Sequence, residues 1–106
     1  MKTFEDLEFK PWIEWCTPVL KELFNEKYKD CTRASLMFPN GFGINVLFGE
    51  YFRSNGVDTY DCMVIKNNSA SYVPLEGTVD GIAGYLNKES VTALMKRIQE
   101  LPADYR

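Results

Sequence analysis

A turn between two runs of strand-forming residues constrains the fold of this chain more than any other feature. Residues 36–49 read Leu-Met-Phe-Pro-Asn-Gly-Phe-Gly-Ile-Asn-Val-Leu-Phe-Gly. Pro39 has the φ angle that the second position of a tight turn requires, and Asn40 and Gly41 tolerate the bridge and left-handed conformations that follow. The apolar and β-branched residues on either side favour strands. The stretch therefore predicts an antiparallel hairpin at the centre of a sheet.

Further strands follow from the same kind of pattern. We expect strands over residues 31–38, 43–49 and 60–66, and a short fourth strand near 70–75. Residues 1–10 are expected to form an edge strand or an extended arm. The stretch from Gly77 to Leu86, which contains three glycines, is expected to form a compact loop. Short connections between consecutive strands imply an antiparallel meander.

Two helices flank the predicted sheet. Thr17 and Pro18 are typical of a helix N-cap followed by proline in the first turn, and apolar residues then recur at helical spacing over 18–29. Asn87 is expected to cap a second amphipathic helix that ends before Pro102. The fold class is therefore α+β: a three- to four-stranded antiparallel β-meander flanked by an N-terminal and a C-terminal helix. Residues 1–106 are expected to form one domain, because this length is near the commonest domain size.

Charge and cysteine content limit the partners. The net charge of −3 makes sequence-independent binding of nucleic acid unlikely, because such binding needs a basic surface. The three cysteines, Cys16, Cys31 and Cys62, have neither the number nor the spacing of a disulfide framework or a zinc site. We expect free thiols in a reducing cytoplasm. The N-terminus lacks a signal-peptide pattern, and no window is apolar enough to span a membrane.

One face of the predicted sheet is only half polar. Strand alternation places Phe42, Ile44 and Val46 together on a face that must pack against a core. The opposite face carries polar and apolar residues together: Arg33, Ser35, Asn45, Asp61, Met37, Leu47, Met63 and Ile65. A sheet face exposed to water rarely collects so many apolar residues. We expect the second helix, the N-terminal arm or a partner chain to cover part of it.

Several segments resemble small proteins of bacteriophages and prophages. The resemblance rests on an N-terminal Phe-x-Asp-Leu-x-Phe segment at 4–9, the hairpin at 38–46, and Asp80-Gly81-Ile82-Ala83-Gly84-Tyr85-Leu86 leading into the last helix. It covers about two-thirds of the chain, and the helix over 18–29 stands as an insertion relative to it. The resemblance implies a bacterial host cell as the setting. It carries over no catalytic or binding residue.

Catalytic chemistry is weakly represented. The chain has no histidine, so a cysteine nucleophile would need a carboxylate or a lysine as its base. Cys62 lies in a run typical of a buried strand. Glu50, Asp58 and Asp61 flank one loop, and two of them could form a carboxylate pair, but solvated loop charges are the favoured interpretation. The glycines at 41 and 43 lie in a hairpin with no helix after it, so they make no phosphate loop. We expect no enzyme activity, no cofactor and no metal.

Interface chemistry is better represented. Tyr51, Phe52 and Arg53 follow the second hairpin strand, and aromatic residues and arginine are enriched in protein interfaces. Trp12 and Trp15 lie near Pro11 and are further candidates. Met37, Leu47 and Met63, on the half-polar face, complete the set of candidate interface residues.

The leading hypothesis is a small non-enzymatic protein-interaction module, phage- or prophage-encoded, that binds a host or phage protein or associates with itself as a homodimer. The alternative is a module that binds a small molecule, or a minimal enzyme, with a pocket between the sheet and the helices.

Overall fold

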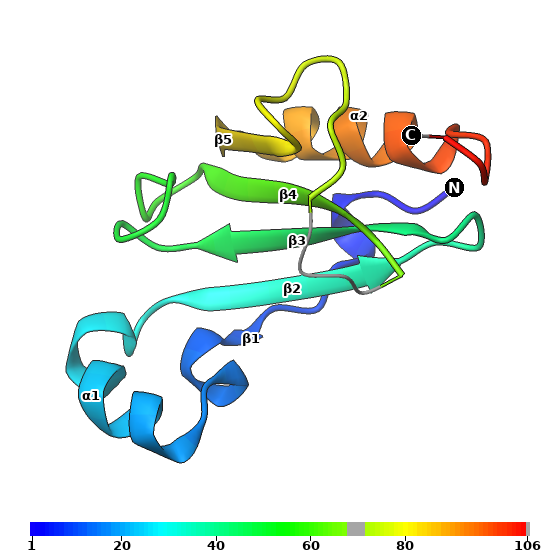
Figure 1. The fold of residues 1–106 in the computed structure, drawn as a ribbon. Helices are drawn as coiled ribbons and strands as arrows, with labels where there is room; N and C mark the ends of the chain where they lie inside the picture. Colours follow the sequence, from blue (N-terminus) through cyan, green and yellow to red (C-terminus); the bar gives the residue numbers. More distant parts are fainter. Residues whose placement is uncertain (68–71, 106) are drawn as a thin grey trace.

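The computed structural model describes residues 1–67 and 72–105 and shows an α+β fold (Figure 1). An antiparallel sheet of five strands has the order β1-β2-β3-β4-β5, so each strand pairs with its neighbour in the chain. The elements in chain order are the 3-10 helix η1 (Phe4–Asp6), β1 (Lys10–Pro11), the 3-10 helix η2 (Trp12–Trp15), α1 (Pro18–Tyr28), β2 (Thr32–Met37), β3 (Phe42–Phe48), β4 (Tyr60–Lys66), β5 (Ile82–Leu86) and α2 (Lys88–Gln99). The predicted fold class is confirmed, but the predicted three to four strands are too few.

The sequence pattern does not predict the fifth strand of the sheet. Residues 70 and 71 of the expected strand over 70–75 lie outside the described residues, and Tyr72 makes only an isolated bridge to Ile65. The next strand is instead Ile82–Leu86, in the stretch expected to be a loop. A tight turn at Val79–Ile82 reverses the chain, and a bulge opposite β4 breaks the period-two pattern. Local alternation therefore does not reveal this strand.

The predicted hairpin forms between β2 and β3, with Leu36 opposite Ile44. Gly41 has a φ of +89°, which explains the glycine there. The Asn40 side chain also reaches beyond the turn. Its Nδ2 donates to the main-chain carbonyls of Ile98 at 2.9 Å and Leu101 at 3.0 Å. The turn therefore holds the end of α2 against the sheet.

The core lies between the sheet and α2. Val91, Leu94, Met95 and Ile98 form the buried row of α2 that the periodicity predicts. They pack against the inward face of the sheet, whose buried members are Ala34, Phe42, Ile44, Val46, Tyr60, Cys62 and Val64. Asn87 Oδ1 accepts a hydrogen bond from the Ser90 amide at 2.8 Å, so the predicted cap is confirmed.

The N-terminal arm joins the same layer. The Phe4 amide donates to Thr92 Oγ1 at 3.1 Å, and Gln99 Nε2 donates to the Lys2 carbonyl at 2.8 Å. The Phe4 ring lies edge-on to Tyr60, with 4.9 Å between ring centroids. The arm thus covers the α2 side of the sheet and not the half-polar face.

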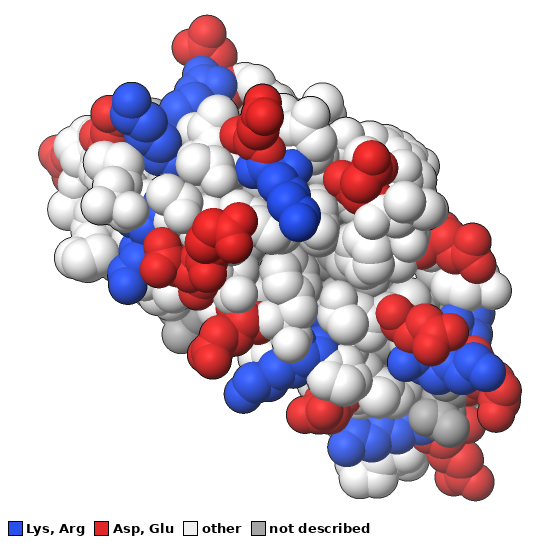
Figure 2. All heavy atoms as spheres, turned by 180° about the vertical axis from the view of Figure 1, so that it is seen from behind, with Lys and Arg blue, Asp and Glu red and all other residues white. Residues whose placement is uncertain are grey.

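Charges are interspersed on the face seen in Figure 2, the reverse of the view in Figure 1. Basic and acidic side chains alternate there and form no broad patch of one sign. That distribution offers no basic stripe for a phosphate backbone to follow on this face. Within the described residues, the search for a helix of membrane-spanning length and hydrophobicity finds none.

Candidate functional site

Helix α1 projects from the sheet and packs mainly on the neighbouring η2. In Figure 1 it lies beside the start of β2, near the β1 edge of the sheet, whereas α2 lies near the β5 edge. Thr17 caps it as predicted, with Oγ1 accepting from the Leu20 amide at 3.4 Å. Unlike α2, it contains no buried residue among its described side chains. Val19, Leu20 and Leu23 are 68%, 40% and 69% exposed.

These three side chains form one surface. Positions 19 and 23 are one helical turn apart, and position 20 is adjacent to them on the same side. We call Val19, Leu20 and Leu23 the α1 apolar row. Single exposed apolar residues are ordinary on a protein surface, whereas several neighbouring ones on one side of a helix are typical of a contact surface.

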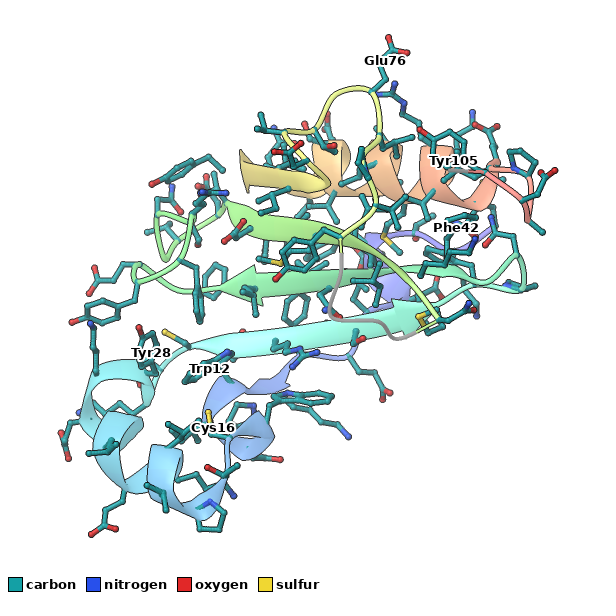
Figure 3. The ribbon with its side chains drawn as sticks, in the orientation of Figure 1. Trp12, Cys16, Tyr28, Phe42, Glu76 and Tyr105 are labelled. Atoms are coloured by element: carbon teal, nitrogen blue, oxygen red, sulfur yellow. The ribbon has the colours of Figure 1, made fainter. Side chains whose placement is uncertain are left out.

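An aromatic cluster attaches α1 to the sheet. Tyr28, in the last turn of α1, lies 4.6 Å from Trp12 and 5.7 Å from Phe52 between ring centroids. Figure 3 shows the Trp12 and Tyr28 side chains turned toward each other between η2 and α1. Tyr51 meets Tyr28 edge-on at 5.4 Å and is half-exposed. The structure therefore brings three predicted interface residues, Trp12, Tyr51 and Phe52, around one residue of α1.

Trp15 and Arg53 lie apart from this cluster. The Trp15 ring is half-exposed and lies over the guanidinium of Arg33, with 4.1 Å from Cζ to the ring centroid. Arg53 is exposed at the opposite edge of the sheet, where its main-chain carbonyl accepts from the Tyr85 amide at 2.8 Å. The two predicted tryptophans are therefore separated: Trp12 packs in the aromatic cluster, and Trp15 contacts Arg33.

The half-polar face holds the remaining candidates. Met63 is buried, and Met37 and Leu47 are half-buried. Among the described residues, three side-chain atoms on this face are buried without a hydrogen-bond partner: Arg33 Nε, Asn45 Oδ1 and Asp61 Oδ1. Burial lowers the pKa of Arg33 and raises that of Asp61. The face is therefore polar and partly covered, and it leaves less apolar area free than the strand alternation suggests.

The thiols have the character of core residues. Cys62 is fully buried, and desolvation, aided by the nearby Asp61 charge, raises the pKa of its thiol to about 12. Desolvation also raises the pKa of Cys31. A nucleophilic cysteine needs a lowered pKa, so neither thiol is suited to catalysis. No group of metal-binding side chains occurs in the part of the chain that the structure describes.

The loop between β3 and β4 is internally braced. Asn55 Oδ1 accepts from the amides of Val57 and Asp58, both at 2.9 Å, and its Nδ2 donates to Asp58 Oδ1 at 2.7 Å. Buried Ser54 donates to the Thr59 carbonyl at 2.6 Å. Of the three candidate carboxylates, Asp61 Oδ2 accepts from the Arg53 amide at 3.2 Å, whereas Glu50 and Asp58 are exposed. Asp58 therefore stabilises the loop through its hydrogen bond from Asn55.

A cavity of about 290 Å³ opens beside this loop. It lies between the C-terminal end of α1, the residues before β2 and the start of the loop. Its lining residues are Lys27, Asp30, Cys31, Phe48, Gly49, Glu50, Tyr51, Asn55, Gly56 and Val57. The sequence singles out Tyr51 as an interface residue and Glu50 as a candidate carboxylate, but it does not predict that they line one cavity, because the walls come from three separate segments.

The α1 apolar row was also missed as a surface. Its helical spacing predicts an apolar side of α1, but the spacing does not predict what that side contacts. Whether such a side is covered depends on the position of α1 relative to the sheet, which the local pattern does not contain. Comparisons of the chain with protein-family models, curated proteins and solved structures give no match.

Proposed function

We propose that this chain is a small non-enzymatic protein-interaction module that binds another protein chain through the α1 apolar row. The observation that carries the proposal is the exposure of Val19, Leu20 and Leu23 on a helix with no buried described side chain. An amphipathic helix of this kind commonly binds by laying its apolar side in a hydrophobic groove.

The charge of α1 supports contact with a protein. Lys21, Glu22, Glu26 and Lys27 are its charged residues, two of each sign, so the helix is neutral within a chain of net charge −3. A neutral helix repels neither an acidic nor a basic partner, and it does not repel a second copy. Self-association is therefore one form of the proposed function.

The size of α1 sets the extent of the contact. A helix of 11 residues is about 16 Å long, and a stable interface buries about 800 Å² on each partner. One side of α1 supplies only part of that area. We propose that the half-exposed ring of Trp15, on the adjacent η2, contributes to the remaining area.

The proposed setting is the cytoplasm of a bacterial host. The resemblance of the hairpin and of the segment before α2 to phage and prophage proteins supports it. The unpaired thiols of Cys16, Cys31 and Cys62 also suit a reducing compartment.

The test compares the wild type with the Val19→Lys/Leu23→Lys variant. Each protein is expressed with a tag in the bacterium that naturally carries its gene. We expect the wild type to elute from a sizing column above its monomer mass of 12.2 kDa and the variant to elute as a monomer. Glu22→Lys on the same helix is the matched control, because it raises the charge by two units, as Val19→Lys/Leu23→Lys does, without removing the apolar row. Elution of the wild type as a monomer, both purified at high concentration and in the extract, would contradict the proposal.

A further inference from the structure

The cavity beside Tyr51 has the shape and chemistry of a small ligand site. Its volume of about 290 Å³ is at the lower end of the range for small-molecule pockets. Phe48, Cys31 and Val57 supply apolar wall, and Asp30 and Glu50 supply negative charge. We propose that this cavity binds a small organic ammonium ion, with the Tyr51 ring and the two carboxylates as its recognition groups.

An ammonium group of the protein itself already lies at this place. Lys27 Nζ is 5.1 Å from the centroid of the Tyr51 ring and 5.5 Å from that of Tyr28. Both distances are within the range of cation–π attraction. The Tyr51 ring, which lines the cavity, is therefore within reach of a cation there, and Lys27 is the competitor that an external ammonium ion displaces.

The charge of the lining favours a cation over an anion. Asp30 and Glu50 give two negative charges against the single positive charge of Lys27. Burial is the main cause that raises the pKa of the Cys31 thiol, and the nearby charges of Asp30 and Glu50 add to it. Displacement of Lys27 leaves a site with two unmatched negative charges beside an aromatic face.

The walls are formed before any ligand arrives. Gly49 has a φ of +144°, and a Cβ at this position would collide with Cys31 Sγ, so a glycine is needed to close the wall. Asn55 and Ser54 hold the opposite wall through the hydrogen bonds described above. A preformed wall spares the entropy of ordering a loop on binding.

The occupant is small. A cavity of about 290 Å³ leaves room for an ammonium group with its methyl or methylene substituents, as in choline. This site does not depend on the α1 apolar row, and the Val19→Lys/Leu23→Lys chain is expected to bind the ammonium ion unchanged.

Choline, titrated into the full ¹⁵N-labelled chain, is the probe. We expect saturable shifts of the Gly49, Tyr51 and Gly56 amide signals, and none with the neutral carbon isostere of choline. Lys27→Met removes the competing ammonium and is expected to tighten binding by about two- to fivefold. Lys29→Met, an exposed lysine that does not line the cavity, is the matched control and is expected to leave the affinity unchanged.

Two further variants address the recognition groups. Tyr51→Leu and Glu50→Gln are each expected to weaken binding, and Glu50→Gln keeps the test valid if loss of the Tyr51 ring disturbs α1. The proposal is overturned if choline gives no saturable shift in the wild type and Lys27→Met. Equal shifts with the neutral isostere, or equal effects of Lys27→Met and Lys29→Met, would also overturn it.

Discussion

The ring of Tyr28 in α1 stacks on the ring of Phe52 in the loop after β3, with centroids 5.7 Å apart and planes inclined by 28°. Trp12 contacts both rings, at 4.6 Å from Tyr28 and 5.8 Å from Phe52. This aromatic contact attaches to the sheet a helix whose other described side chains are all exposed. Because α1 is held at one end, its apolar row remains free for another chain.

Loss of Tyr28 is expected to release α1 while the core stays folded. In Tyr28→Ala, amide hydrogen exchange over α1 should accelerate toward the rate of an unfolded peptide, because an isolated helix of this length is marginal in water. Exchange over α2 should stay slow. Lys29→Ala, one residue further along, is the control. Unchanged protection of α1 in Tyr28→Ala would show that the aromatic cluster does not hold the helix.

Core substitutions are expected to differ between α2 and the end of β3. Ile98→Ala should lower the free energy of unfolding by about 2–5 kcal/mol, because Ile98 is fully buried. Phe48 is only half-buried, although alternation places it on the core face, and Phe48→Ala should cost less than Ile98→Ala. Chemical denaturation of both variants measures which substitution lowers the free energy of unfolding more. A larger loss for Phe48 would mean that its ring contributes more than its burial indicates.

Tyr85 is expected to be a site of backbone strain. It is 64% exposed and has a φ of +57°, a conformation that costs a residue with a Cβ about 1–2 kcal/mol. Tyr85→Gly should therefore leave stability unchanged or raise it by up to about 1 kcal/mol, because the chain entropy of glycine offsets part of the gain. Ala83→Gly in the same strand should be destabilising. Thermal unfolding of both variants tests this expectation. A clear loss of stability in Tyr85→Gly would show that the exposed ring makes a stabilising contact.

The buried carboxylate of Asp61 gives a pH dependence of known sign. Desolvation is the largest cause of its shift and raises its pKa above the ordinary value, so the folded state binds this proton more tightly than the unfolded state. The resulting destabilisation is absent below the unfolded-state pKa and is complete once the pH exceeds the folded-state pKa. Asp61→Asn should therefore be more stable than the wild type at pH 7, with the difference vanishing near roughly pH 3.

Denaturant midpoints at the two pH values test this expectation. Asp104→Asn, at an exposed position near the C-terminus, serves as the control for loss of a negative charge. If Asp61→Asn is less stable than the wild type at pH 7, the hydrogen bond from the Arg53 amide to the charged carboxylate outweighs the cost of burial.

The three thiols are expected to react at different rates. Cys31 and Cys62 are buried with raised pKa values, whereas Cys16 is half-buried. A thiol reagent should label one cysteine rapidly in the native protein and the other two only on unfolding. Cys16→Ser should abolish the rapid phase. Rapid labelling that persists in Cys16→Ser would show that a core thiol becomes accessible in the native state.

The sequence predicts the parts of this fold that depend on local chemistry. Pro39-Asn40-Gly41 predicts the hairpin, Thr17 and Asn87 predict helix caps, and the period of residues 91–98 predicts the buried row of α2. The fifth strand was missed because a tight turn and a bulge, with Tyr85 at positive φ, erase the alternation that marks a strand.

The candidate sites were predictable only in part. Trp12, Tyr51 and Phe52 stand out by residue type, but their meeting around Tyr28 depends on how α1 folds back toward the sheet. The exposure of Val19 and Leu23 has the same origin, because an apolar helix side looks alike in sequence whether the chain itself or a partner covers it. The cavity depends on three separate segments and has no signature in any one of them.

Site-specific photo-crosslinking in cells tests the central claim most directly. A photoreactive amino acid is placed at Leu23, in the α1 apolar row, or at Lys21, on the opposite side of the same helix. We predict a discrete protein adduct from position 23, absent from position 21 and abolished by Val19→Lys, whose mass tells a second copy from a foreign protein. No adduct from position 23, or equal adducts from both positions, would contradict the role of the α1 apolar row.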